Sequence, residues 1–292
     1  MAVWNLGSIN ADIVFAVPRI PAPGETLASR GRSLYLGGKG ANMSVAAARA
    51  GAHAVHVGAV GADGRWAVEQ LTEWGVDTRF VRVLDEDTGQ AIILVDDDGE
   101  NAIVLHPGAN RAIPAALVEE ALSGAATGDW FVCQNETNGL AEAAKLAKAM
   151  GLKVAHAAAP FEAEAVTPLL PSLDLLVLNA VEAAQLAEAT GRALGELGVA
   201  DVIVTLGGDG SEWHHGARTE RFAPVKVEPV DTTGAGDTFT GYLLASLDRG
   251  MAMDEALRLA SHAGALMVTR KGTADVIPDL AEVLAFRKER GT

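Results

Sequence analysis

The sequence predicts a three-layer α/β/α domain with a mainly parallel central sheet and a small β-sheet inserted into it as a lid. Beyond about residue 125, short and nearly continuous apolar runs alternate with helical patterns, which is typical of parallel strands buried on both faces. In the first third, apolar runs are instead joined by a turn-forming connection, as antiparallel ribbons are. We expect residues 1–292 to form a single domain, with the lid formed from about 12–36 and 88–106.

The first third of the chain is expected to hold a strand, two helices and the ribbons of the lid. Asp96-Asp-Asp-Gly99-Glu100 separates two apolar runs and favours a hairpin connection. Gly51 and Gly75 each end a helical pattern, because glycine readily adopts the left-handed conformation. The expected strands are Val3–Leu6, Thr26–Leu36, Gln90–Val95 and Asn101–Leu105, and the expected helices are about Ala41–Ala50 and Arg65–Trp74.

The rest of the chain alternates between the two kinds of element, and Gly151 and Gly191 end two of its helices. The expected strands are Trp130–Gln134, Leu152–His156, Leu173–Leu178 and Val202–Leu206, and the expected helices are Leu140–Met150, Val181 to about Thr190, and roughly 235–248, 254–270 and 279–288.

Composition excludes several classes of function. A net charge of −15 and a pI of about 4.8 argue against nucleic-acid or anionic-membrane partners. The single cysteine, Cys133, excludes an intramolecular disulfide, and its apolar surroundings predict a buried core thiol. No apolar run approaches the length of a membrane span, and the N-terminus has no basic region followed by an apolar one. We expect a cytoplasmic protein.

The most informative segment is Asp231-Thr-Thr-Gly-Ala-Gly-Asp237, which opens a helix. Gly234 and Gly236 allow close approach of a ligand to the backbone, and the N-terminal N–H groups of the helix favour an anion such as phosphate. Asp237 follows in the first turn, where a carboxylate can accept a proton from an attacking hydroxyl. The alternative is a glycine-rich helix entry in which Asp237 only satisfies the helix dipole.

Two earlier segments carry polar groups suited to hydroxyls. Leu36-Gly-Gly-Lys-Gly-Ala-Asn42 opens a helix, and it is not a Walker A loop because Gly40 occupies the Ser/Thr position. Gly7-Ser-Ile-Asn10-Ala-Asp12 closes the first strand, and Asn10 and Asp12 should point to the same side, toward a polyol. A structural loop explains the first segment as readily, and an Asx turn is the alternative for the second.

Two later segments follow strands directly. Asn179-Ala-Val-Glu182 is either a capping box or a pair of residues that hold water around a magnesium ion bridging phosphates. Thr205-Leu-Gly-Gly-Asp-Gly210 is a flexible loop suited to lie along a nucleotide.

In order and spacing, these motifs resemble those of the ribokinase family of PfkB-type carbohydrate kinases. Gly37–Asn42 resembles the family's N-terminal signature and Asp231–Asp237 its C-terminal one. Gly7–Asp12, 106–110, 134–136 and 268–272 resemble ribokinases more than fructokinases or adenosine kinases. The resemblance spans nearly the whole chain and implies a ribokinase-like fold.

The resemblance also implies a role for each matching residue. Asp237 is the implied general base, with the amides of Gly234, Ala235 and Gly236 as the anion hole. The implied sugar ligands are Asn10, Asp12, Gly38, Lys39, Gly40, Asn42, Glu136 and Asp237. The implied ATP contacts are Asn179, Glu182, Thr205, Leu206, Gly207, Gly208, Asp209, Gly210, Gly236 and Ser261, with Glu182 also helping to organise Mg²⁺. The implied K⁺ site comprises Asp231, Thr233, Met267, Arg270, Gly272 and Val276.

The sequence departs from ribokinases at three places, one of which is Gly234, where some ribokinases have alanine. Ser261 stands where they often carry an asparagine near the adenine, and His262 lies next to it. Asn135 stands at a position that is usually apolar and is expected to alter the sugar pocket.

The leading hypothesis is an ATP-dependent kinase for the 5-hydroxyl of ribose or a similar pentose. One alternative is a relative acting on a nucleoside, a ketohexose such as fructose, or a keto-deoxy sugar acid, although Asp12 and Glu136 favour a neutral polyol. Another is a non-catalytic sugar sensor, which has no need of a base at Asp237. Because Ala91–Val95 and Ala102–Leu105 are apolar on both faces, we also expect a homodimer packed through the lids.

Overall fold

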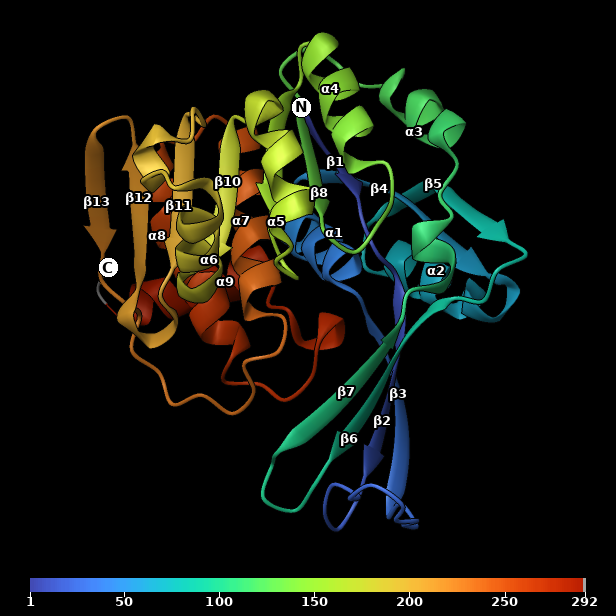
Figure 1. Cartoon of the computed structure of the whole chain (residues 1–292). Coiled ribbons are helices and arrows are strands. Elements are labelled where there is room, and N and C mark those ends of the chain that lie inside the picture. The colour runs from blue at the N-terminus through green and yellow to red at the C-terminus, as the bar shows by residue number, and fades with distance from the viewer. Residues whose placement is uncertain (291–292) are drawn as a thin grey trace.

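The protein is built on a large central sheet with helices on both faces, and a second, smaller sheet extends away from this body (Figure 1). The structure is a computed structural model and describes residues 1–290. The large sheet has nine strands in the order β13-β12-β11-β10-β9-β8-β1-β4-β5. In this spatial order, all strands from β11 across to β5 run parallel to one another, whereas β12 and β13 form an antiparallel edge. This confirms the predicted three-layer α/β/α class.

The strands of the large sheet are short and mostly buried. Their bounds are β1 Ala2–Leu6, β4 His53–Gly61, β5 Asp77–Leu84, β8 Trp130–Gln134, β9 Lys153–Ala157, β10 Leu175–Asn179, β11 Asp201–Thr205, β12 Ser211–His215 and β13 Arg218–Phe222. Successive residues of a strand face opposite sides, so that Val132 belongs to one core cluster while Phe131 and Cys133 belong to the other. Cys133 is fully buried, as predicted.

The helices divide between the two core clusters. One face is covered by α1 Lys39–Arg49, α2 Arg65–Glu73, α7 Ala235–Asp248, α8 Met253–Met267 and α9 Leu280–Glu289. The other is covered by α3 Ala115–Leu122, α4 Leu140–Ala149, α5 Ala163–Val166 and α6 Ala180–Thr190. Among residues 1–290, no helix has the length and apolar character needed to cross a membrane.

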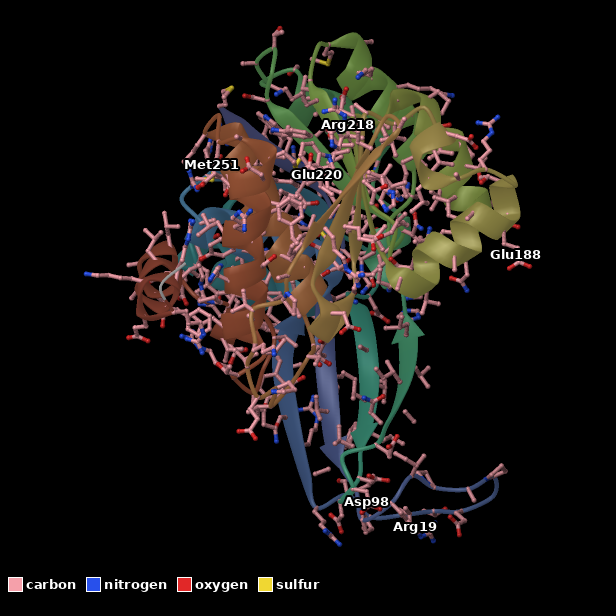
Figure 2. All side chains as sticks on the ribbon, turned by 90° about the vertical axis from the view of Figure 1, so that its left-hand side faces the viewer. Arg19, Asp98, Glu188, Arg218, Glu220 and Met251 are labelled. Atoms are coloured by element: carbon pink, nitrogen blue, oxygen red, sulfur yellow. The ribbon has the colours of Figure 1, made fainter. Side chains whose placement is uncertain are left out.

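The small sheet has the order β3-β2-β6-β7. Its strands are β2 Asn10–Ala16, β3 Gly31–Gly37, β6 Gly89–Val95 and β7 Asn101–His106. The two central strands, β2 and β6, are parallel to each other, and each outer strand is antiparallel to its neighbour. Arg19 and Asp98 lie at the far end of this sheet, away from the helical body (Figure 2).

Several elements, most of them in the first half of the chain, differ from the prediction. The ribbon expected at Thr26–Leu36 is a strand only from Gly31, and its partner is β2. Asn10 and Asp12 therefore lie in a strand of the small sheet rather than in a loop after β1. Strands β4 and β5, helix α3 and the β12–β13 hairpin were not predicted as elements, and α8 ends at Met267 rather than near residue 270. The remaining expected elements lie within about two residues of their predicted bounds.

The strand order reverses at β1, which lies between β8 and β4 and is parallel to both. In open α/β sheets, ligands bind beyond the carboxyl ends of the strands at such a point. The segments that follow β1, β8, β10 and β11 include the polar motifs singled out in the sequence, so the topology brings them to one edge.

Candidate functional site

Asp237 lies in the first turn of α7 and is almost fully buried. Gly234 precedes the helix with φ +74°, a left-handed conformation that favours glycine. The side-chain amide of Asn42 donates a 2.9 Å hydrogen bond to Oδ2 of Asp237. Burial raises the pKa of Asp237, whereas the charge of Lys39 and the Asn42 hydrogen bond lower it. A buried carboxylate therefore sits beside the N-terminal N–H groups of a helix.

The charge of Lys39 interacts with three carboxylates of the site. The Asp237 carboxylate raises the pKa of the Lys39 ammonium against the effect of burial, and Glu136 and Glu182 add to the rise. The backbone N–H of Lys39 also donates to Oε2 of Glu136 over 3.1 Å, and the Ser8 hydroxyl donates to the same oxygen. The loops that follow β1 and β8 are thus joined to the start of α1 through Glu136.

Asp12 is a second acidic group of the cluster, placed on β2 together with Asn10. Burial raises the pKa of Asp12 to about 7, and the neighbouring charges of Glu136 and Asp237 add to the rise. A Cβ on Gly37 of β3 would overlap with the Asp12 carboxylate, so glycine at this place makes room for it. Asn10 is also buried, and both side chains lie at the base of the small sheet.

Gly40 is needed for close packing of two backbones. A Cβ there would overlap with the backbone of Gly7 and Ser8. Gly38 has φ +94°, and a Cβ on it would lie 2.9 Å from the Ser8 carbonyl oxygen. The glycines of this motif therefore let the N-terminus of α1 approach the end of β1, and this brings Lys39 and Asn42 into the cluster.

A cavity of about 350 Å³ adjoins the cluster. It is lined by Lys39, Met43, Ala157, Ala158, Ala159, Val177, Leu178, Asn179, Glu182, Thr205, Thr232, Thr233, Gly234, Gly236, Asp237 and Thr240. Asp237 and Lys39 thus face a space bounded by the ends of β9, β10 and β11. The cavity joins the predicted base to residues predicted to contact ATP.

Asn179 and Glu182 form a capping box at the start of α6, as the structural alternative predicted. Asn179 Oδ1 accepts from the Glu182 backbone N–H over 2.9 Å, and Glu182 Oε2 accepts from the Asn179 N–H over 2.8 Å. Both residues also line the cavity. The capping box therefore orients these side chains and leaves them at the wall of the site.

The loop Thr205–Gly210 begins at this cavity. Thr205 lines the cavity and donates a 3.3 Å hydrogen bond to the Leu178 carbonyl, while Gly207, Gly208 and Asp209 are exposed. Leu206 and Gly210 are joined by a 2.8 Å backbone hydrogen bond that closes the turn.

Ser261 lies at a different cavity. That space, about 500 Å³, is lined by Phe222, Ala223, Pro224, Val225, Lys226, Arg258, Ser261, His262, Arg287 and Arg290. The Ser261 hydroxyl donates to the Leu257 carbonyl within α8 over 2.8 Å. Ser261 is therefore not among the residues that surround Asp237.

The predicted K⁺ residues form a cluster of turns next to α7. Asp231 accepts from the N–H groups of Thr233 and Gly272 over 2.9 and 3.3 Å. Arg270 joins the other two members, because its N–H donates to the Met267 carbonyl and its guanidinium to the Val276 carbonyl. The Asp231 carboxylate is the anionic oxygen donor that a hard cation such as K⁺ would use, whereas the Met267 and Val276 carbonyls accept hydrogen bonds from Arg270.

Residues 1–290 contain no group of three or more His, Cys, Asp or Glu side chains arranged to hold a metal ion. Mg²⁺ commonly needs no such cage, because one or two carboxylates, phosphate oxygens and water complete its octahedron. Glu182 and Asp237 at the cavity fit that limited role.

The buried residues that support the cluster were not predicted from the sequence. Asn5 donates to the Gly40 carbonyl over 2.8 Å and to Ser44, which in turn contacts His56 over 2.8 Å. Burial lowers the pKa of His56 to about 4, which keeps it neutral. Asn135 donates its amide to the carbonyls of Ala158 and Pro160, and its expected effect on the sugar pocket stays a prediction. No local sequence pattern indicates such contacts, because the partners are far apart along the chain.

Comparison with known proteins agrees with this geometry. A family model described as pfkB family carbohydrate kinase matches residues 3–280. A ribokinase of Haemophilus influenzae is 35% identical, over 96% of this chain and 96% of that protein. The crystal structure of a ribokinase from Thermotoga maritima matches with a TM-score of 0.90 at 32% identity, over 99% of each chain. An Arabidopsis thaliana ribokinase complexed with ribose and ATP matches with a TM-score of 0.87 at 30% identity, over 99% of each chain.

Proposed function

The chain belongs to the pfkB family of carbohydrate kinases, and we propose that it transfers the γ-phosphoryl group of ATP to the 5-hydroxyl of ribose or a similar pentose. The similar Arabidopsis ribokinase is a complex with ribose and ATP, which supports this pair of substrates. The acidic pocket residues Asp12 and Glu136 also favour a neutral polyol, because hydroxyl groups donate to carboxylates.

In this proposal, Asp237 accepts the proton of the 5-hydroxyl as that oxygen attacks the γ-phosphorus. The bond between the γ-phosphorus and the bridging oxygen breaks, and ADP leaves with the electron pair. The N–H groups of Gly234, Ala235 and Gly236 stabilise the negative charge of the transferring group, as helix N-termini do. The charge of Lys39 lowers the pKa of Asp237 against the larger effect of burial, and this favours the ionised form that a base requires.

The remaining site residues divide between the two substrates. We assign the sugar to Asn10, Asp12, Gly38, Lys39, Gly40, Asn42 and Glu136. We assign ATP to Asn179, Glu182, the loop Thr205–Gly210 and Gly236. Ser261 is the candidate contact to the adenine ring. Glu182 would help to hold Mg²⁺ at the phosphates, where the ion would supply positive charge against the γ-phosphoryl group. Asp231 would hold K⁺, which would brace the loop that carries the anion hole.

One observation carries the proposal. The buried Asp237 carboxylate lies at a helix N-terminus, between a polar cluster with Asp12 and Glu136 and a cavity with Asn179 and Thr205. Acceptor and phosphoryl donor can thus meet at a single base.

We further propose that the small sheet is a lid over the sugar and that two lids pack together in a homodimer. Exposed apolar side chains on the outer strands support this: Leu34, Tyr35, Ile103, Val104 and Leu105. Large exposed apolar patches commonly mark interfaces.

The test is a thermal-shift screen of pentoses, fructose, nucleosides and sugar acids, followed by a coupled assay of ADP release with each ligand that binds. We expect ribose to raise the melting temperature and to stimulate ADP release. Turnover of a nucleoside or hexose without turnover of ribose would refute the pentose assignment. Sugar binding without phosphoryl transfer would identify a sensor.

A further inference from the structure

A short turn at the base of the small sheet contacts both segments assigned to the sugar. It is the 3₁₀ turn Gly108–Arg111, and it follows β7 after a single residue, Pro107. The turn is also fastened to the residues before β6, since the Ala109 N–H donates to the Asp87 carbonyl over 2.8 Å. Both strands of the β6–β7 hairpin are therefore linked to this turn: β7 runs into it along the chain, and β6 follows the residue, Asp87, that is hydrogen-bonded to it.

Asn110 holds the beginning of β2. The residue is only 1% exposed. Its Oδ1 accepts from the Ile9 backbone N–H over 2.9 Å, and its Nδ2 donates to the Ile9 carbonyl over 3.2 Å and to Oδ1 of Asn10 over 2.7 Å. Asn110 thus bonds both the backbone next to Asn10 and the Asn10 side chain.

These contacts fix which way the Asn10 amide points. A backbone N–H can only donate, so the Asn110 atom facing Ile9 N–H must be its oxygen, and its NH₂ must face Asn10. Asn10 must then present its own oxygen to Asn110, which leaves its NH₂ group for another partner. Asn10 consequently acts as a hydrogen-bond donor in the pocket, next to acceptor carboxylates at Asp12 and Glu136.

Arg111 holds the other segment. Its guanidinium donates to the carbonyls of Asn135 and Thr137 over 3.0 and 2.9 Å. These two carbonyls flank Glu136, whose carboxylate contacts Ser8 and the N–H of Lys39. Arg111 therefore restrains the backbone on both sides of Glu136 without bonding the carboxylate itself.

Gly89, the first residue of β6, makes the Asn110 contact possible. A Cβ at this position would overlap with Nδ2 of Asn110 and Oδ1 of Asn10, the two atoms that form the hydrogen bond. The start of the β6 strand is thus packed directly against this pair.

We propose that Asn110 and Arg111 are positioning residues for the acceptor sugar, and that they couple the base of the small sheet to the geometry of the pocket. The inference rests on the proposed function, in which Asn10 and Glu136 bind the sugar. Asn110 orients the Asn10 amide so that its NH₂ group faces the pocket. Arg111 fixes the position of the backbone that carries Glu136. Neither residue touches the cavity that adjoins Asn179 and Thr205, so ATP binding is independent of them.

The test compares steady-state kinetics of Asn110→Asp, Arg111→Ala and Arg111→Lys with wild type. Asp at position 110 still accepts from Ile9 but cannot donate to Asn10. We expect the KM for ribose to rise about 10- to 100-fold in Asn110→Asp and Arg111→Ala, the scale of a misplaced binding group. The KM for ATP should stay within about threefold of wild type, and Arg111→Lys, which keeps one donor, should recover part of the loss. Arg82→Ala, which removes an exposed arginine paired with Glu120, is the matched control and should change neither KM.

A double-mutant cycle separates positioning from general stability. In an Asn10→Ala background, Asn110→Asp should add little to the KM for ribose, because its effect passes through Asn10. Gly89→Ala should reproduce the Asn110→Asp kinetics. Fully additive effects, equal rises of both KM values, or an unchanged KM for ribose would overturn the proposal. Wild-type activity tests the proposed function separately: if wild type phosphorylates another acceptor, the same comparison is made with that acceptor, and a wild type without any acceptor overturns both proposals.

Discussion

The amide of Asn42 donates its hydrogen bond to Asp237 across 195 positions of sequence, and so joins the first turn of α1 to the first turn of α7. Both helices begin at glycine motifs, and both lie on the same face of the large sheet. The contact gives the two signature motifs one shared purpose: the helix that follows the proposed sugar loop orients the proposed base. Burial makes the negative charge of Asp237 costly, and a hydrogen bond donated to the carboxylate favours the charged form.

The first prediction concerns Asp237→Asn. If Asp237 is the base, kcat should fall about 10²- to 10⁴-fold, the usual contribution of a positioned base. The amide has nearly the same shape, so the fold and the thermal shift produced by ribose should persist. Turnover above about a tenth of the wild-type value would show that another group takes the proton.

The second prediction concerns the acid side of the pH–rate profile. Asp237 must be ionised to act, burial raises its pKa, and the Asn42 hydrogen bond lowers it. Replacing Asn42 with leucine removes that lowering, so the pKa rises further. The acidic limb of kcat should then move to higher pH by about one unit, the equivalent of a hydrogen bond to a charged group. A limb that stays in place would show that Asp237 does not control it.

Apart from the β12–β13 hairpin, the sequence predicted the second half of the chain closely, because its parallel strands are almost wholly apolar and alternate with long helices. Strand β8 was predicted with the bounds that the structure has, and α7 likewise. The first half was harder. The chain leaves β1 and starts β2 after only three residues, and this change of sheet has no local signal. Strand β5 carries Arg79 and Arg82 among its apolar residues, and at the edge of the sheet Arg79 is exposed and Arg82 only partly buried.

The candidate site was predictable where a motif carried it and not where tertiary packing did. Asp237, Lys39, Asn42 and Glu136 were expected together, and they do lie in one cluster. Ser8 and Asn110 were not expected, because each acts through a partner about 100 or more positions away. Only the folded chain brings such pairs into contact.

The third prediction relates pH to stability at Asp12. Its pKa is about 7 in the folded protein against an ordinary value of 3.8. The folded state therefore holds a proton that the unfolded state has released, so this stabilising contribution is complete below about pH 4 and is lost as pH rises through about 7. Asp12→Asn removes this dependence, so the gain in melting temperature over wild type should be larger at pH 8 than at pH 5, while the KM for ribose rises.

The comparison needs ligand-free protein, and Asp98→Asn at the exposed tip of the small sheet is the matched control. His56 and His156, whose pKa values burial lowers to about 4, cost stability as pH falls from 6.5 to 4. That loss is common to wild type and variant, so it cancels in the difference. A melting-temperature difference equal at the two pH values would contradict the prediction.

The fourth prediction concerns cations. Activity should require Mg²⁺ and should be higher in K⁺ than in Na⁺ at constant ionic strength. Asp231 lies directly before the loop that forms the anion hole and accepts from the N–H groups of Thr233 and Gly272, so an ion bound at its carboxylate would stiffen that loop. Asp231→Asn should reduce the difference between K⁺ and Na⁺ while leaving the requirement for Mg²⁺. Equal wild-type rates in the two salts would contradict the proposed K⁺ site.

The last prediction concerns assembly. Strand β7 is an edge strand, and Ile103, Val104 and Leu105 are 53%, 68% and 55% exposed, so apolar side chains point outward on both of its faces. One face can cover the sugar of its own subunit, and the other is then stabilised by a second copy of the same strand, as two-fold contacts allow. Ile103→Asp should convert a dimer into a monomer in sedimentation at micromolar concentration and should weaken ribose binding at the same time, because the lid loses its support. Leu284→Asp places the same charge at an exposed leucine of α9 and should leave both properties unchanged. A wild-type protein that sediments as a monomer would refute the dimer, and a dimeric Ile103→Asp would place the interface elsewhere.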